Sequence, residues 1–182
     1  WVVNDCAAPL DVVRALVAAA PSALTRKDAR GGLVLHYAAA NRAQPGVVEL
    51  LLRAYPEAAA VLEDMQALLP LHLAAANHAP AASVRLLIDA NPQACSIGAL
   101  SQHGWLPLHF AIEYRQSPDI VARMLACYPD AARVEVHVPA CAGVPAHAQL
   151  PLHRALYLGQ LDHVAMLLRV HPEGARVPDN LH

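Results

Sequence analysis

The feature that most constrains the fold is a short stretch that recurs along the chain. It reads Leu-Pro-Leu-His-Leu-Ala-Ala-Ala at residues 69–76, and related stretches occupy 33–40, 106–112 and 150–156. Intervals of 36, 37 and 44 residues separate the histidines of the four copies, which are His36, His72, His109 and His153. Self-similarity at a nearly fixed period predicts a repeat protein in which each unit stacks on the next.

A second block follows each copy. It reads Val-Val-Glu-Leu-Leu-Leu-Arg-Ala-Tyr-Pro-Glu-Ala-Ala at residues 47–59, and its relatives occupy 12–23, 83–94, 120–132 and 163–175. Apolar residues in these blocks follow helical spacing and form a one-sided stripe. The proline near the end of each block is expected to end the helix, because it lacks the N–H that a helix interior needs. Prolines between the two blocks mark a turn, so each unit is predicted to be helix, short turn, helix, followed by a polar stretch.

Composition limits the functional classes. The chain has 182 residues, of which 56% are hydrophobic and only 4% aromatic, a mixture that favours closely packed helices with small side chains. A net charge of −2 gives no electrostatic reason to expect a nucleic-acid or membrane partner. The four cysteines form no Cys-x-x-Cys pair, which favours a reduced, intracellular setting, and the cytoplasm is the expected location.

Histidines and other reactive residues do not form a recognisable chemical site. Histidines in successive stacked units would lie roughly 10 Å apart, the packing distance of helices, whereas two ligands of one zinc ion lie about 2 Å from it. His137, Cys141 and His147 form one cluster of metal-ligand types in the long segment 134–149, but their spacing matches no zinc pattern. Gly-x-Ser-x-Gly and phosphate-binding loops are absent from the sequence. We therefore predict no catalytic residue, no metal and no cofactor.

The repeated units resemble ankyrin repeats, whose pattern is Asp-x-x-Gly-x-Thr-Pro-Leu-His-x-Ala-Ala, a turn and a Val-x-x-Leu-Leu helix. Residues 28–36 follow it with Leu for Thr and Val for Pro, and residues 64–72 have Ala67 at the glycine. Residues 101–109 keep Gly104 but have Ser for Asp, and residues 145–153 keep only Leu-Pro-Leu-His. The resemblance implies an all-α ankyrin-repeat solenoid of stacked helix-turn-helix units with β-turn or hairpin fingers. It also implies that the histidines bond backbone groups within and between neighbouring fingers.

The repeats run through the whole chain, so residues 1–182 are predicted to form a single array. The expected units are a partial repeat at 1–27, repeats at about 28–63, 64–100, 101–144 and 145–178, and the start of another at 179–182. Both ends then cut through a repeat, and we expect an excerpt of a longer array that is monomeric or part of a longer chain.

By resemblance, the function is expected to be non-catalytic binding of a protein partner through the concave face and the finger loops. The alternative is a targeting or regulatory segment of a larger enzyme, of the kinase or ubiquitin ligase type, whose catalytic domain lies outside this chain. Alanine and asparagine at 40–41 and 76–77 predict a shallow first half of the groove, with any anchor in the second half. The family's contact positions give the candidate partner-binding residues Arg30, Met65, Gln66, Gln102, His103, Trp105, Glu113, Tyr114, His147, Gln149 and Tyr157.

Overall fold

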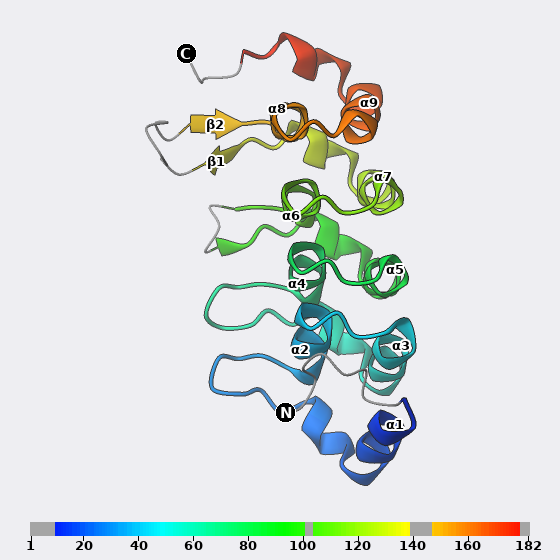
Figure 1. Ribbon diagram of the computed structural model, residues 1–182. Coiled ribbons are helices and arrows are strands. Elements are labelled where there is room, and N and C mark those ends of the chain that lie inside the picture. Colours follow the sequence, from blue (N-terminus) through cyan, green and yellow to red (C-terminus); the bar gives the residue numbers. More distant parts are fainter. Residues whose placement is uncertain (1–9, 101–103, 139–146, 179–182) are drawn as a thin grey trace.

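The computed structural model describes residues 10–100, 104–138 and 147–178, and within these ranges helix pairs stack into an elongated array (Figure 1). The inner column of helices contains α2 (Val34–Ala40), α4 (Pro70–Ala76), α6 (Pro107–Glu113) and α8 (Pro151–Tyr157). The outer column contains α1 (Leu10–Ala19), α3 (Pro45–Ala54), α5 (Ala81–Ala90), α7 (Pro118–Cys127) and α9 (Leu161–Val170). Each inner helix packs on the next inner helix and on its own outer partner, so the predicted helical solenoid is confirmed.

A one-turn 3-10 helix follows each outer helix, which the sequence analysis did not predict. These turns are η1 (Pro21–Leu24), η2 (Pro56–Ala60), η3 (Pro92–Ser96), η5 (Pro129–Arg133) and η6 (Pro172–Arg176). The outer helix does end before its proline, but the proline then opens a new helical turn. Proline is tolerated there because the first N–H of a helix has no partner within the helix. The small residues after it, such as Ala58 and Ala59, are buried against the array, so this segment is not simply a polar loop.

The loops that join one unit to the next project from the inner column as fingers (Figure 1). In the fourth finger, β1 (Val136–Val138) pairs antiparallel with β2 (His147–Gln149), and Val136 lies opposite Gln149. The tip of this finger lies outside the described residues. In the third finger a single bridge joins Ala99 to Trp105. A hairpin finger is therefore present, as the resemblance implied.

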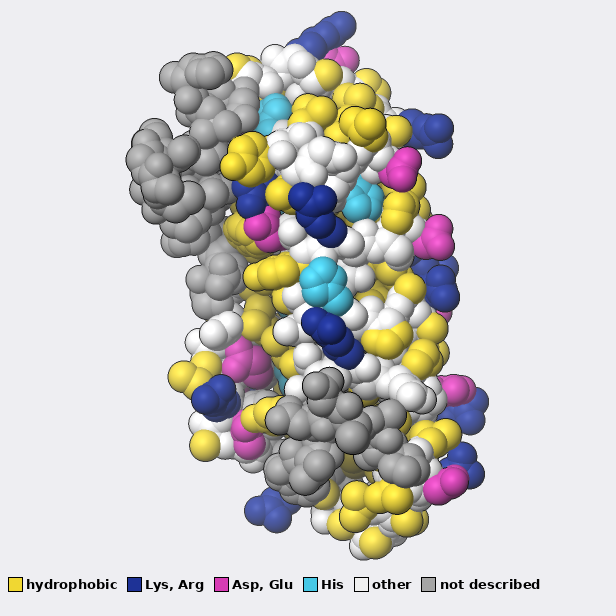
Figure 2. Space-filling view, viewed as in Figure 1, with side chains coloured by type: hydrophobic (Ala, Val, Ile, Leu, Met, Phe, Trp, Pro, Cys, Tyr) yellow, Lys and Arg dark blue, Asp and Glu magenta, His cyan; other side chains and the backbone are white. Residues whose placement is uncertain are grey.

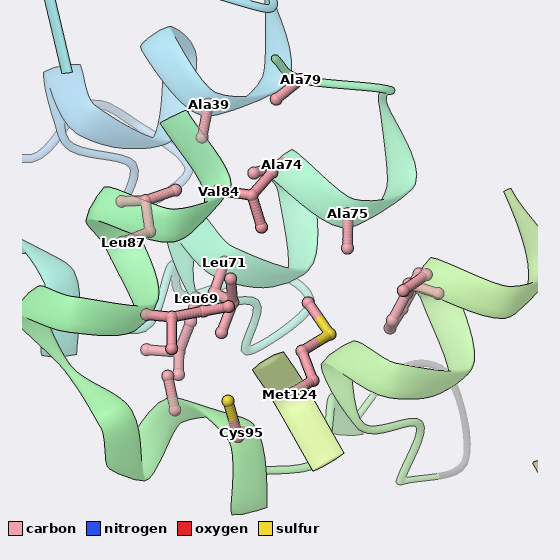
Figure 3. Close-up of a cluster of buried hydrophobic side chains, with 14 of the residues drawn as sticks. Ala39, Leu69, Leu71, Ala74, Ala75, Ala79, Val84, Leu87, Cys95 and Met124 are labelled. Carbon is pink, nitrogen blue, oxygen red and sulfur yellow. The ribbon is translucent and has the colours of Figure 1, made fainter. Parts of the chain in front are cut away.

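The two leucines of each Leu-x-Leu-His stretch form the centre of the core. All eight are buried: Leu33, Leu35, Leu69, Leu71, Leu106, Leu108, Leu150 and Leu152. Figure 3 shows Leu69 and Leu71 in one apolar cluster with Leu87 of α5 and Met124 of α7. Because each unit shares its leucines with the next, the core runs without a break along the array.

Replacing Leu71 or Leu108 with alanine is expected to lower the free energy of unfolding by roughly 2–5 kcal/mol, because each leaves a cavity in this shared core. Both side chains are only 1% exposed. Denaturant unfolding measures the change, and Leu100→Ala is the matched control because that leucine is 81% exposed. A loss below about 1 kcal/mol at both core positions would contradict the stacking described here.

Candidate functional site

The repeated histidines hold the base of each finger. In the first three full units, the histidine Nδ1 accepts a hydrogen bond from the backbone N–H of the leucine three residues earlier, at 3.1, 3.0 and 3.0 Å from Leu33, Leu69 and Leu106. An N–H can only donate, so the ring proton is on Nε2. That atom donates to the carbonyl oxygen of the residue that begins the next finger, at 3.0, 2.9 and 3.1 Å for Val61, Ile97 and Val134.

The histidine contacts confirm the structural role that the resemblance implied. His36, His72 and His109 use both ring nitrogens on backbone groups, so neither nitrogen is available to a metal ion. His153 keeps the bond from Nε2 to the Val177 carbonyl, at 3.0 Å, but its buried Nδ1 has no hydrogen-bond partner among the described residues. The fourth unit is also the one whose finger departs most from the repeat pattern.

Burial keeps His36, His72 and His109 neutral. It lowers the pKa of both His72 and His109 to about 4, and it also lowers the pKa of His36. Protonation of Nδ1 would replace an acceptor with a donor that faces another N–H group, so the charged ring is incompatible with the finger geometry.

The first finger, residues 27–33, is organised by Asp28. Its Oδ1 accepts hydrogen bonds from the backbone N–H groups of Arg30 and Gly32, at 2.9 and 2.7 Å, and its Oδ2 accepts one from the Tyr37 hydroxyl. The bond to Tyr37 is the main cause that lowers the pKa of Asp28, and the same bond raises the pKa of Tyr37. The finger and the first inner helix are thereby fixed to each other.

The second finger, residues 61–69, is bonded to the first finger, and hydrogen bonds within the second finger hold its turn. The Asp64 N–H donates to the Arg30 carbonyl at 2.9 Å, and Lys27 forms an ion pair with Asp64 at 2.8 Å. Gly31 allows this approach, because a Cβ at that position would lie 2.2 Å from Asp64 Cγ. The Glu63 carboxylate accepts from the N–H groups of Met65 and Gln66, at 3.2 and 2.6 Å. This loop holds the Met65 side chain out from the array, 68% exposed.

A hollow of about 230 Å³ lies between these two fingers and the inner helices; we call it the finger groove. It contains three predicted candidates, Arg30, Met65 and Gln66, which come from two successive fingers. Tyr37 also lines it and was not predicted. The described residues that form the groove are Arg30, Gly32, His36, Tyr37, Ala40, Glu63, Met65, Gln66, Leu68 and Leu73.

The first half of the groove is deeper than predicted, whereas the placement of an anchor in the second half stays a prediction. The sequence predicted a shallow first half of the groove, yet the finger groove lies there, and a second hollow of about 480 Å³ lies beside it, also lined by Tyr37. The hollow beside Trp105 in the second half is only about 10 Å³.

The other candidates are spread along the array. Trp105 is half-buried and packs on the rings of Phe110 and His109, with centroids 5.4 and 6.2 Å away. Glu113 accepts hydrogen bonds from Arg154 at 2.5 and 2.6 Å, and the Arg154 guanidinium also lies 5.2 Å from the centroid of the Tyr157 ring. Tyr157 is 73% exposed, and Tyr114 is exposed beside the His78 ring.

Gln149 is a correction to the predicted set. It is 2% exposed, because it ends β2 opposite the buried Val136 and precedes the buried Leu150, so its side chain is not available to a partner. Gln102 and His103 lie outside the described residues. His147 is described only as a backbone position of β2, paired with Val138.

Among the described residues, no group of three or more His, Cys, Asp or Glu side chains is placed to hold a metal ion. The sequence contains one cluster of metal-ligand types, and it lies outside that part of the chain. Its members are Cys141 and the side chains of His137 and His147. None of the described helices has the length and apolar character needed to cross a membrane.

Comparison with known families bears on the same region. Residues 35–136 match a family model described as ankyrin repeats (3 copies). The match begins in α2 and ends in β1, so it covers more than half of the chain and includes most of the finger groove. Comparison with curated proteins returned no match.

The buried histidines predict that stability depends on pH. Between pH 6.5, the ordinary histidine pKa, and the folded pKa of about 4, His72 and His109 bind a proton only in the unfolded chain. The contribution of these histidines to the free energy of unfolding is then fully present above pH 6.5. As the pH drops toward 4, the free energy of unfolding falls by about 1.4 kcal/mol per pH unit for each histidine. Urea unfolding at pH 7 and pH 5 measures this slope, and His72→Gln is expected to reduce it. An unchanged unfolding midpoint at the two pH values would contradict the conclusion that these histidines are buried and neutral.

Proposed function

The chain belongs to the ankyrin repeat family, and we propose that it is a non-catalytic module that binds a protein partner in the finger groove. Ankyrin repeats generally mediate protein–protein interactions and are typically non-catalytic. The observation that carries the proposal is the groove itself, in which exposed side chains from two successive fingers face one hollow over the inner helices. The apolar faces of α2 to α7 are already buried by their neighbours, which leaves this surface for a partner.

The size of the groove supports a protein partner over a small molecule. Pockets that enclose drug-sized ligands have volumes of roughly 300–1,000 Å³, and the finger groove is smaller, at about 230 Å³. It is suited to one or two side chains that project from a larger binding surface. A partner would then contact the finger tips around it.

The chemistry of the lining also fits a protein interface. Met65, Tyr37 and Arg30 belong to residue types that are enriched where proteins bind one another. Leu68 and Leu73 supply an apolar floor, while Arg30, Glu63 and Gln66 supply polar groups at the rim. We infer that the groove accepts an apolar or aromatic side chain of the partner.

The fingers are held in place before a partner arrives. Asp28 and Glu63 cap the turns of the first two fingers, and the contacts of Asp64 with Arg30 and Lys27 join the fingers to each other. A surface that is already ordered loses less conformational entropy on binding. This rigidity supports a role in recognition, with Trp105, Tyr114 and Tyr157 as candidates for further contacts along the inner helices.

Met65→Glu is the substitution that tests the proposal. A carboxylate at the exposed tip of the second finger would place a charge over the apolar floor and is expected to reduce partner recovery about tenfold or more, the effect of a central contact. The measurement is affinity capture from a lysate, with quantitative mass spectrometry of the bound proteins. Met65 is a cleaner position than Trp105, whose ring also packs on Phe110 and His109.

Ala122→Glu is the matched control, because it adds the same charge at an exposed position of the outer helix α7. Circular dichroism should show the same helix content for both variants. A partner recovered equally by the wild type, Met65→Glu and Ala122→Glu would place binding elsewhere and would overturn the proposal.

A further inference from the structure

The turns between inner and outer helices share an unusual backbone feature. Six residues after each repeated histidine, the chain adopts a left-handed conformation, with φ of 56° at Arg42, 55° at His78, 52° at Arg115 and 70° at Gly159. Only glycine adopts this conformation without steric cost, because Cβ otherwise approaches the following carbonyl oxygen. The fourth turn shows that glycine fits, yet the first three turns carry large side chains with cationic or imidazole groups.

The side chains at the first three positions form a connected row, which we call the basic ladder: Arg42, His78 and Arg115. All three are exposed. Arg42 Nε donates to the carbonyl oxygen of Asn77 at 2.6 Å, which places its guanidinium beside His78. The His78 ring packs edge-on against Tyr114, with centroids 6.3 Å apart, and Tyr114 precedes Arg115. One contact therefore joins the first turn to the second, and another joins the second turn to the third.

Little in the fold uses the two arginine charges. The Arg115 side chain makes no hydrogen bond or ion pair with the described residues, and Arg42 uses only its Nε. The three turns, residues 41–46, 77–82 and 114–119, contain one acidic residue, Asp119. The nearby Glu113 is already paired with Arg154. Helix C-termini do favour a neighbouring cation, but a cation anywhere in the last turn would serve and would need no left-handed residue.

The ladder lies at the end of the inner helices opposite the fingers, because each finger enters its inner helix and each turn leaves it. Figure 2 shows Lys, Arg and His side chains in a row along the face on which these turns lie. The molecule as a whole has a net charge of −2, so this row is a local departure from its overall charge.

We propose that the basic ladder binds an extended, acidic segment of a protein partner. Successive helices in the stack lie about 10 Å apart, and an extended chain in the polyproline II conformation rises about 3.1 Å per residue with three residues per turn, so every third side chain faces the same way. Carboxylates at every third residue of the segment would then meet successive rungs, and Arg42 and Arg115 could each bind one through two N–H groups. The Tyr114 ring offers an apolar contact between rungs. The proposal goes beyond the finger groove, and either surface can fail its test without the other.

A peptide titration followed by NMR tests the ladder. The probe is an acetylated and amidated peptide of four Glu-Ser-Gly units, added to the 15N-labelled chain at about 20 mM salt, where charges act over roughly 20 Å. The expected result is that backbone resonances of the three ladder turns shift and those of the finger groove do not. A peptide of the same composition with its glutamates consecutive is expected to bind more weakly.

The variant Arg42→Gln/Arg115→Gln removes two rungs. Glutamine also has a Cβ, so the steric cost of the left-handed conformation stays the same. The double variant is expected to weaken binding of the probe about threefold to tenfold, as for two exposed ion pairs. The control Arg14→Gln/Arg85→Gln removes the same charge from exposed positions of α1 and α5 and is expected to bind like the wild type. Equal losses in the two double variants, equal binding of the two peptides, shifts centred on the fingers, or no binding would each overturn the proposal.

Discussion

The structure depends on one neutral imidazole in each of the first three full units, which accepts from the leucine N–H at the start of its inner helix and donates to the carbonyl that begins the next finger. A leucine at the helix start cannot cap the helix with a side-chain oxygen, as threonine would in the family pattern. The histidine accepts from the leucine N–H, as the N3 side chain of a capping box does, and the leucine side chain is free to join the core. One side chain thus joins helix start, core and finger, and its burial keeps it uncharged.

This arrangement separates the parts that hold the array together from those that can bind. The leucines, the small residues after Pro56, Pro92 and Pro129, and three of the repeated histidines are enclosed by neighbouring units. Finger tips and helix turns remain exposed, and their residues differ from unit to unit. In the first two fingers, Asp28 and Glu63 fix the loops, so that Arg30, Met65 and Tyr37 face a common hollow. The same logic applies at the opposite helix ends, where three turns carry large side chains in place of glycine.

The residues that recur at the same place in each unit could be predicted, because a position that repeats along a stacked array is one that each unit buries against the next. The helices and the buried leucines followed from this recurrence, whereas the histidine bonds followed from the resemblance to ankyrin repeats. Three features were not predicted. The turns that begin at Pro56 and its equivalents were missed because a proline that ends one helix can also start another. Gln149 was placed at the surface from the family's contact positions, but the residue before the Leu-x-Leu-His stretch is enclosed in other units as well, since Gly32 and Leu68 are also buried. Tyr37 was missed because its exposure depends on where the two fingers lie.

The most direct test of this account is the protonation state of His36, His72 and His109 in the folded chain at neutral pH. Long-range proton–nitrogen NMR correlations distinguish the two neutral forms of imidazole from the charged form. The account predicts that all three rings are neutral and carry their proton on Nε2, because Nδ1 accepts from a backbone N–H. Rings protonated on Nδ1, or charged rings, would contradict the histidine bonds on which the fingers and their groove depend.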